Sequence, residues 1–243
     1  GDGGFVPDAM ICHYMELWKF RDLLESQSLF FTRLTNFRDG FEGTSPAMLP
    51  LVQREMIRAA GGDVAAHLEL AERWHVATTS RTLANCWNER PAESMGFWER
   101  YAGGLQGRAG VALVSTQGAL QDALGEKVLI SRIRYIDFET EPEYSSNPLH
   151  RGITKSLEYS DENECRALIH DFPYGDGVSY WDPLPDDVAV GYHVRADLAT
   201  LLQRVVISPY SPDIRADVDA MLQTASGLAV MSEPSSLQRP RFF

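Results

Sequence analysis

The sequence has 243 residues, a length that suits one large domain or two small ones and permits a sizeable buried core. Its 44% of hydrophobic and 23% of charged residues are ordinary for a globular protein and exclude overall disorder. Because 22 lysines and arginines face 34 aspartates and glutamates, the net charge of -12 disfavours non-specific attraction to nucleic acid or anionic lipid. A nucleic-acid acceptor would need a local basic patch.

The cysteines and the apolar runs indicate a cytoplasmic protein. Cys12, Cys86 and Cys165 are far apart and odd in number, so their spacing matches neither a zinc site nor a disulfide framework. No apolar run approaches the roughly 20 residues that a bilayer crossing requires. No charged start followed by an apolar core marks a signal peptide. We therefore expect reduced thiols, a cytoplasmic location and no membrane partner.

The first part of the chain predicts a strand, a helix and a second strand. Residues 13–20 mix aromatic, apolar and charged side chains in a way that suits a strand. Residues 21–28 have the composition of a short helical turn, and residues 29–32 are again rich in strand-forming residues. A loop with Asn, Asp and two glycines follows at residues 34–43, where backbone freedom is needed.

A helical insertion is predicted for residues 46–76. Their composition changes to Ala, Leu, Glu, Arg and Met, and apolar residues recur at helical spacing. Gly61 and Gly62 divide the segment into two helices. We expect both helices to pack on the sheet.

The middle of the chain combines three strands with one aromatic helix. Residues 83–88, 110–115 and 128–138 are strand candidates, and the second of them is a short apolar run typical of a buried strand. Residues 93–102 predict a helix whose aromatic residues recur three apart on one face. An aromatic helix face belongs to a core more often than to a site.

The chemically most informative stretch is Lys155 to Arg166. If it forms a strand, Glu162, Glu164 and Arg166 project from one face, because alternate residues of a strand share a face. Two carboxylates beside a guanidinium indicate a place where something polar is held, since like charges repel unless a cation or ligand lies between them. The alternative is an edge strand with a solvated face, on which Arg166 simply neutralises Glu164.

The rest of the chain predicts a long loop followed by short elements. Residues 171–187 contain several prolines and aromatic residues, which is typical of a loop that covers a site. Strands are expected at 188–194 and 204–209, and helices at 197–202 and 214–225. Short strands interrupted by helices, without regular alternation, predict one α+β domain over residues 1–243 with a mixed, mainly antiparallel sheet.

Several common sites are excluded by their missing motifs. Residues 103–107 are glycine-rich, but they lack the lysine and hydroxyl of a phosphate-binding loop and the strand-to-helix setting of a dinucleotide fingerprint. The serines lack a nucleophile-elbow sequence. His67 and His75 are eight residues apart on helix-like sequence, which is not the spacing of a metal-ligand pair.

Polar and aromatic residues from three segments are candidates for one ligand cleft with cations, carboxylates and aromatic rings. This mixture fits an anionic, ring-bearing ligand, because guanidinium groups pair with phosphate and aromatic faces stack on heterocycles. The alternative is that Arg38, Asp39 and Glu42 only hold their loop together. The candidates are His13, Tyr14, Trp18, Lys19, Arg33, Asn36, Arg38, Asp39, Glu42, Glu162, Glu164 and Arg166.

A resemblance to a known family is carried by segments 17–20, 29–42, 97–102, 110–113, Lys155 with 159–166, and 206–209. Through these segments most of the chain, in order, resembles a large bacterial family catalogued as domain of unknown function 2971. The family usually shows Asn-Asp-Pro-Phe-Glu, where this chain has Phe37-Arg38-Asp39-Gly40-Phe41-Glu42 and so keeps only Asp, Phe and Glu.

The layout of that family is similar to that of ADP-ribosyltransferases, whose late strand supplies a catalytic glutamate. The resemblance implies NAD as a substrate, with Glu164 holding the 2′-hydroxyl of the nicotinamide ribose as the ribose becomes oxocarbenium-like. Glu162 would then orient or deprotonate the acceptor. The other residues implied at the NAD site are Tyr14, Trp98 or Tyr101 as the ring that stacks on nicotinamide, Arg33 or Arg38 as the diphosphate partner, and Lys19 and Arg166.

Three functions follow from these residues. The first is an NAD-consuming ADP-ribosyltransferase of a bacterial toxin or phage-defence type, with a protein or nucleic-acid acceptor, no metal, and an inhibitor protein if it is a toxin. The second is a non-catalytic ligand-sensing or protein-interaction module whose late charged strand is structural. The third is a divalent-metal hydrolase that uses Asp39, Glu42, Glu162 and Glu164 as oxygen ligands.

Overall fold

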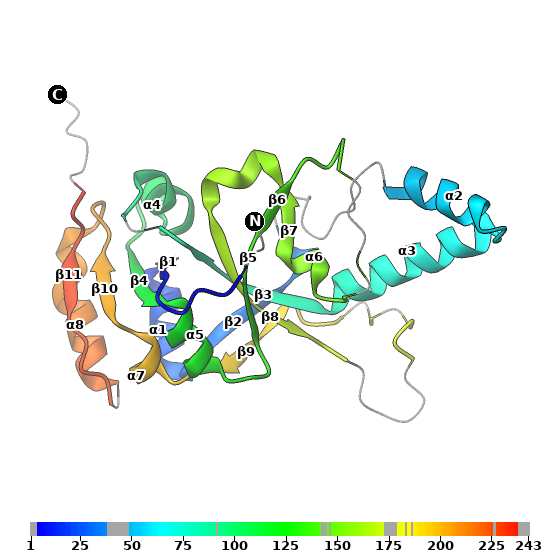
Figure 1. The fold of residues 1–243 in the computed structure, drawn as a ribbon. Coiled ribbons are helices and arrows are strands. Elements are labelled where there is room, and N and C mark those ends of the chain that lie inside the picture. The colour runs from blue at the N-terminus through cyan, green and yellow to red at the C-terminus, as the bar shows by residue number, and fades with distance from the viewer. Residues whose placement is uncertain are drawn as a thin grey trace. The chain divides into compact units, whose positions relative to one another are not determined.

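Figure 1 shows the fold of the chain in a computed structural model. The chain forms two compact units. Unit 1 includes Phe31–Asn85 and Ser131–Tyr192, and unit 2 is formed by Phe5–Phe30, Cys86–Ile130 and His193–Phe243. The residues that the structure describes are 4–37, 49–90, 92–141, 145, 147–172, 179–182, 184–185, 187–225 and 227–237. Most of the predicted loop at 34–43, and part of the predicted loop at 171–187, therefore lie outside the described residues.

Unit 2 is built around strand β4 (Gly110–Thr116), whose apolar run is buried almost throughout. It pairs antiparallel with β1 (Met10–Glu16) on one side and with β10 (Arg204–Ile207) on the other. Parallel to β10 lies β11 (Ser232–Pro234). A continuous apolar run is what a strand buried on both faces requires, so this prediction is confirmed.

The helices of unit 2 pack against these strands, and one of them corrects the predicted first strand. Strand β1 ends at Glu16, and residues 17–20 begin helix α1 (Leu17–Ser26). The reason is that Phe20, Leu23 and Leu24 bury one helical face. The other helices are α4 (Met95–Tyr101), α5 (Gln117–Leu124), α7 (Leu198–Leu201), α8 (Arg215–Thr224) and the 3₁₀ turns η2 (Gly104–Gln106) and η4 (Pro212–Ile214).

Unit 1 contains the predicted helical insertion and the charged segment. Helices α2 (Leu49–Ala59) and α3 (Val64–Arg81) contact each other, and the Asp63 carboxylate caps α3 by accepting from the backbone N–H groups of Ala65 and Ala66. The remaining elements of this unit are η1 (Leu34–Asn36), β6 (Arg134–Ile136), α6 (His150–Ile153), β7 (Thr154–Ser156), η3 (Leu157–Glu162) and β8 (Glu164–His170).

The chain passes from one unit to the other within four strands. These are β2 (Ser28–Arg33), β3 (Thr82–Asn88), β5 (Leu129–Arg132) and β9 (Gly191–Arg195). Inside unit 1, Thr32 and Arg33 of β2 pair antiparallel with Ala84 and Leu83 of β3, while β6 and β7 are parallel. Inside unit 2, β3 pairs antiparallel with β1 at Asn88 and Cys12.

The strands form a mainly antiparallel, open sheet alongside several helices, which confirms the predicted α+β class. The likeness to ADP-ribosyltransferases stays a prediction, as does the organisation as one domain. Within the described residues, no helix is both long enough and apolar enough to cross a bilayer.

Substitution of Gly110 tests how closely the chain is packed around this residue in unit 2. A Cβ atom at this position would overlap the carbonyl oxygen of Ala102 and would lie 2.7 Å from Ala102 Cβ and 3.0 Å from the carbonyl oxygen of Met15. Two of these contacts are to backbone, which cannot rotate away, so we expect Gly110→Ala to lower the free energy of unfolding by about 1–3 kcal/mol. Urea unfolding followed by circular dichroism measures the change.

Gly96→Ala is the matched control for this substitution. Gly96 lies inside α4 with its nearest neighbour 3.8 Å from the added Cβ, so the exchange is expected to be neutral or stabilising. Equal stabilities of the two variants would show that the close approach at Gly110 is not what requires glycine there.

Candidate functional site

The candidate site is a group of four charged side chains in unit 1. Lys155 comes from β7, Glu162 from the end of η3, and Glu164 and Arg166 from the start of β8. Between η3 and β8 the chain turns at Asn163, which has a φ of 43°. Glu164 and Arg166 thus share a strand face as predicted, but the prediction of one strand that includes Glu162 is wrong, because the 3₁₀ helix delivers Glu162.

The four side chains form one hydrogen-bonded ion network. Arg166 holds Glu164 with two bonds, from Nε to Oε1 at 2.8 Å and from Nη2 to Oε2 at 3.0 Å. The Lys155 ammonium donates to Glu162 Oε2 at 2.8 Å and more distantly, at 3.4 Å, to Glu164 Oε2. A bidentate guanidinium fixes both the position and the orientation of a carboxylate.

All four members of the network are buried. Arg166 has 0% exposure, Glu162 and Glu164 have 6% each, and Lys155 has 7%. The alternative of an edge strand with a solvated face is therefore wrong. Burial of an ion costs several kcal/mol, and two cations beside two carboxylates offset that cost only while the pairing is complete.

The surroundings of the network hold it in place. The Lys155 ammonium lies 4.7 Å from the centre of the Tyr159 ring, and the Arg166 guanidinium lies 5.4 Å from that of Phe37. Arg166 Nη1 also donates to the carbonyl oxygen of Gly152 at 3.1 Å. The backbone N–H of Glu164 donates to the Tyr135 hydroxyl at 2.8 Å, and burial raises the pKa of this tyrosine, so the phenol stays protonated at neutral pH.

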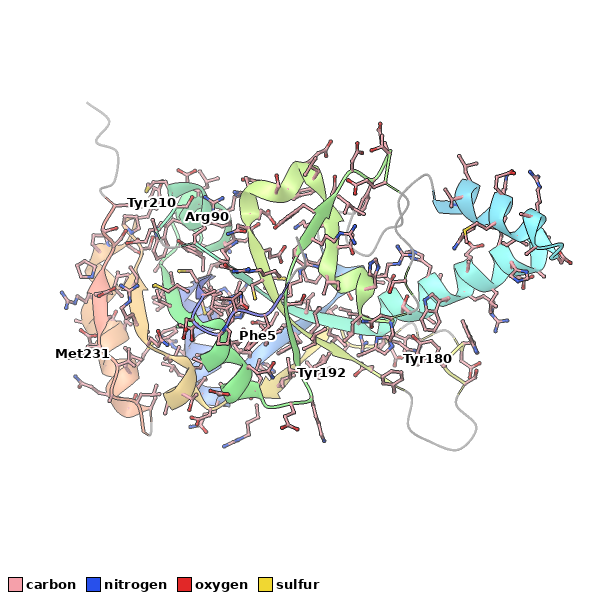
Figure 2. All side chains as sticks on the ribbon, in the orientation of Figure 1. Phe5, Arg90, Tyr180, Tyr192, Tyr210 and Met231 are labelled. Carbon is pink, nitrogen blue, oxygen red and sulfur yellow. The ribbon has the colours of Figure 1, made fainter. Side chains whose placement is uncertain are left out.

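Arg33 belongs to the same unit, and its donors bond the protein itself. Its Nε donates to the carbonyl oxygen of Ala189 at 2.9 Å, its Nη1 to that of Ser80 at 3.1 Å, and its Nη2 pairs with Asp171 at 2.9 Å. Asp171 also accepts from the Tyr192 hydroxyl at 2.6 Å; Figure 2 labels this tyrosine. To bind a diphosphate, Arg33 would have to give up these bonds, and that role stays a prediction.

Asn36 ends η1 in unit 1, and the other predicted ligand residues with a described position lie in unit 2. Tyr14 and Trp98 are 7% and 0% exposed, and their rings meet edge to face with centroids 4.8 Å apart. Tyr101 is 41% exposed and stacks on Phe97 at 5.6 Å. Of the three rings considered for nicotinamide, Tyr101 therefore presents the most surface.

The remaining predicted residues include Trp18, Lys19 and three residues of the loop at 34–43. Lys19 lies over the exposed ring of Trp18, with its ammonium 5.5 Å from the ring centre. Arg38 lies outside the described residues, as do Asp39 and Glu42. Within the described part of the chain, no three His, Cys, Asp or Glu side chains are grouped as a metal site would require.

Sequence reasoning missed Lys155 as the centre of the network. Its separations of seven and nine residues from the two glutamates match no helix or strand period, because the intervening η3 brings the ends of the segment together. The sequence separation therefore does not predict this contact. The only hint was the lysine at the start of the charged stretch.

A second missed feature is a hydrogen-bond chain in unit 1 that runs through His170. The Thr82 hydroxyl donates to the carbonyl oxygen of Thr78 at 2.7 Å, so its oxygen accepts from His170 Nδ1 at 2.9 Å. His170 Nε2 then accepts from the Tyr180 hydroxyl at 3.0 Å; Tyr180 is labelled in Figure 2. Burial lowers the pKa of His170 to about 4, with Asp171 raising it and Arg81 lowering it, so the ring is neutral at pH 7.

Comparisons of the chain with protein-family models, with curated proteins and with solved structures gave no match. The resemblance to the uncharacterised bacterial family therefore stays a prediction. The function is argued below from the geometry of the network.

The network predicts a strong coupling between Glu164 and Arg166. Arg166→Met removes both bonds of the bidentate pair from the buried carboxylate of Glu164, so we expect a loss of about 3–5 kcal/mol in the free energy of unfolding. The double variant Glu164→Gln/Arg166→Met is expected to lose less than the sum of the two single variants, because each removes the same pair. Urea unfolding of all four proteins measures this cycle.

Arg204→Gln is the control for the cycle. The pair between Arg204 and Glu233 is as short, at 2.8 Å, but its side chains are 48% and 43% exposed. Solvent screening limits such a pair to about 1 kcal/mol or less. Losses of equal size at Arg166 and Arg204 would contradict the importance of burial.

The lowered pKa of His170 predicts that the stability of the protein depends on pH. Its pKa in the folded protein is about 4, below the ordinary value of 6.5, so between these values the unfolded chain binds a proton that the folded chain does not. Stability is therefore expected to fall as the pH drops from 7 to 5. His170→Gln removes the group that binds this proton, so it should flatten the slope of the unfolding free energy against pH.

In His170→Gln, the slope of the unfolding free energy against pH is not expected to reach zero. Burial also lowers the pKa of His13 to about 4, and its Nδ1 donates to the carbonyl oxygen of Cys86. Urea unfolding at pH 7, 6 and 5 compares the two proteins. A slope in His170→Gln as steep as in the parent would show that His170 takes up a proton in the folded state.

Proposed function

We propose that this chain is an NAD-dependent ADP-ribosyltransferase-like enzyme that transfers ADP-ribose to a protein or nucleic-acid acceptor. The observation that carries the proposal is the buried pair of carboxylates, Glu162 and Glu164, which converge on the Lys155 ammonium while Arg166 fixes Glu164 with two bonds. Such an enzyme would suit a bacterial toxin, with its own inhibitor protein, or a phage-defence effector.

Cleavage of NAD requires a carboxylate that is oriented before the substrate binds. When the bond between ribose C1′ and the nicotinamide nitrogen breaks, its electron pair leaves with nicotinamide and positive charge develops on the ribose. A carboxylate that accepts from the ribose 2′-hydroxyl stabilises this charge most when it is fixed in advance in a water-poor setting. Glu164, held by Arg166 and 6% exposed, meets this requirement.

The two contacts of Lys155 indicate how a substrate would enter. The Lys155 ammonium lies 3.4 Å from Glu164 but 2.8 Å from Glu162, so the contact to Glu164 is the weaker one. A ribose hydroxyl would replace Lys155 on Glu164 while Arg166 keeps the carboxylate oriented. Glu162 would accept the proton that the acceptor loses as its nucleophilic atom bonds to C1′.

The second candidate is a non-catalytic ligand-sensing or protein-interaction module. The observation that favours it is that both oxygens of Glu164 already accept from cations, in a network of two positive and two negative side chains. In that case the network only holds β7, η3 and β8 together. The two candidates differ in whether nicotinamide is released.

The deciding experiment is incubation of the purified protein with NAD and chromatography of free nicotinamide, with and without cell extract as acceptor. We expect release by the parent protein and a loss of about 10²–10³-fold in Glu164→Gln, since one preorganised electrostatic contact to a transition state is typically worth that much. Glu162→Gln should impair transfer to the acceptor more than it impairs NAD cleavage.

Glu158→Gln serves as the control, because Glu158 is an exposed glutamate of η3. Its rate should equal that of the parent. Circular dichroism checks that each variant is folded. A folded Glu164→Gln protein that releases nicotinamide at the parent rate would overturn the assignment of Glu164, and no release by the parent with extract present would favour the module.

A further inference from the structure

A small pocket of unit 1 lies between one face of α3 and the turn at residues 179–182. Its volume is about 260 Å³. Ligand pockets for molecules of drug or cofactor size are larger, about 300–1,000 Å³, so this one fits a single side chain or a small ion. The described residues that line it are Glu69, Glu72, Arg73, Val76, Ala77, Ser80, Trp181 and Asp182.

The α3 side of the pocket follows from helical periodicity. Its lining residues recur three and four apart, which places them in one stripe along the helix. Glu69 and Glu72 supply two carboxylates to this stripe, and Val76 and Ala77 supply an apolar surface. The helix is thus acidic at one end of the pocket and apolar at the other.

The opposite wall is a turn that a buried arginine anchors. Arg81 is 4% exposed, and it donates from Nε to the carbonyl oxygen of Tyr180 at 3.3 Å and from Nη2 to that of Asp182 at 2.9 Å. Within the turn, the Asp182 carboxylate accepts from the backbone N–H of Ser179 at 2.8 Å. These bonds set Trp181 and Asp182 in fixed positions facing α3.

Trp181 already contacts one guanidinium. The Arg73 side chain lies over the Trp181 ring with its guanidinium carbon 5.5 Å from the ring centre, and Trp74 packs beside the same ring at 5.9 Å. The negative face of an indole ring attracts a flat cation in this way. This intramolecular contact shows that a guanidinium can lie over the Trp181 ring.

We infer that this pocket binds a guanidinium-bearing side chain of a partner polypeptide. The described lining residues include three carboxylates and one guanidinium, which together give a formal charge of -2 and favour a cationic guest. A bare divalent metal would need six or more oxygen ligands, whereas Trp181 and the apolar α3 surface offer it none. A guanidinium has flat apolar faces for the ring and N–H groups for the carboxylates, so it uses both kinds of wall.

This site is distinct from the network of Lys155, Glu162, Glu164 and Arg166, because the two have no residue in common. We expect its occupancy to be the same with and without NAD. The proposal therefore stands or falls separately from the proposed transferase activity.

The test is a titration of the protein with N-acetylarginine amide, followed by the indole N–H signal of Trp181 in proton–nitrogen correlation spectra. Trp181→Phe assigns that signal. We expect a saturable shift with the arginine compound and none with N-acetylcitrulline amide, which has the same shape but no charge. Affinity should fall as salt is raised, since the guest is held by partly exposed charges.

Variants of the exposed lining residues separate the contributions, and asparagine at position 182 keeps a side-chain oxygen that can accept from the Ser179 N–H. Glu72→Gln/Asp182→Asn should weaken binding at least fivefold. Arg73→Ala should tighten it at least twofold, because it removes both a like charge and an internal competitor for the Trp181 ring. Glu158→Gln, an exposed glutamate outside the pocket, should leave the affinity unchanged.

Three results would overturn the inference. They are the absence of a saturable shift, an equal shift with the citrulline compound, and an unchanged affinity in Glu72→Gln/Asp182→Asn.

Discussion

The bidentate pair of Arg166 and Glu164 is the interaction on which the rest of unit 1 depends. Both side chains start on the same face of β8, and both are removed from water. Either charge alone would be costly to bury, so each side chain needs the other as its partner. The pair also needs hydrogen-bond partners from the neighbouring segments. The carbonyl of Gly152 and the ammonium of Lys155 complete the pairing from outside the strand.

Unit 1 uses buried arginines to join segments that are distant in sequence. Arg33, Arg81 and Arg166 are each 5% exposed or less, and each donates to a backbone carbonyl of a separate segment. A guanidinium suits this purpose because its five N–H groups reach several acceptors in fixed directions. Arg81 positions the turn at residues 179–182 in this way, through the carbonyl oxygens of Tyr180 and Asp182.

Much of the fold could be predicted because it follows from local pattern. The apolar run of β4 and the two helices separated by Gly61 and Gly62 depend on periodicity and on backbone freedom, which the sequence displays directly. The start of α1 could not be placed as reliably. Leu17 and Phe20 suit a strand or a helix equally well, and the buried face of α1 decides between them.

Three of the four site residues, Glu162, Glu164 and Arg166, could be predicted from the sequence, but the part played by Lys155 could not. The alternation of Glu164 and Arg166 is visible in the sequence, but their burial and the approach of Lys155 arise from the turn at Asn163 and from η3. Arginines illustrate the same limit. A free guanidinium and one that bonds carbonyls look identical in a sequence, and Arg33 turned out to bond Ala189, Ser80 and Asp171.

Lys155 is the residue at which stability and the proposed activity compete. A completely paired carboxylate is stable but closed to a ligand, and a carboxylate that is open to a ligand is unstable when it is buried. The network lies between these limits, because Arg166 secures Glu164 with two short bonds and Lys155 adds a longer third contact. A ligand hydroxyl that replaces this third contact leaves Glu164 paired with Arg166 and Lys155 paired with Glu162. After this exchange each of the four buried charges still has a partner. The network that stabilises the fold is therefore compatible with the proposed catalysis at Glu164.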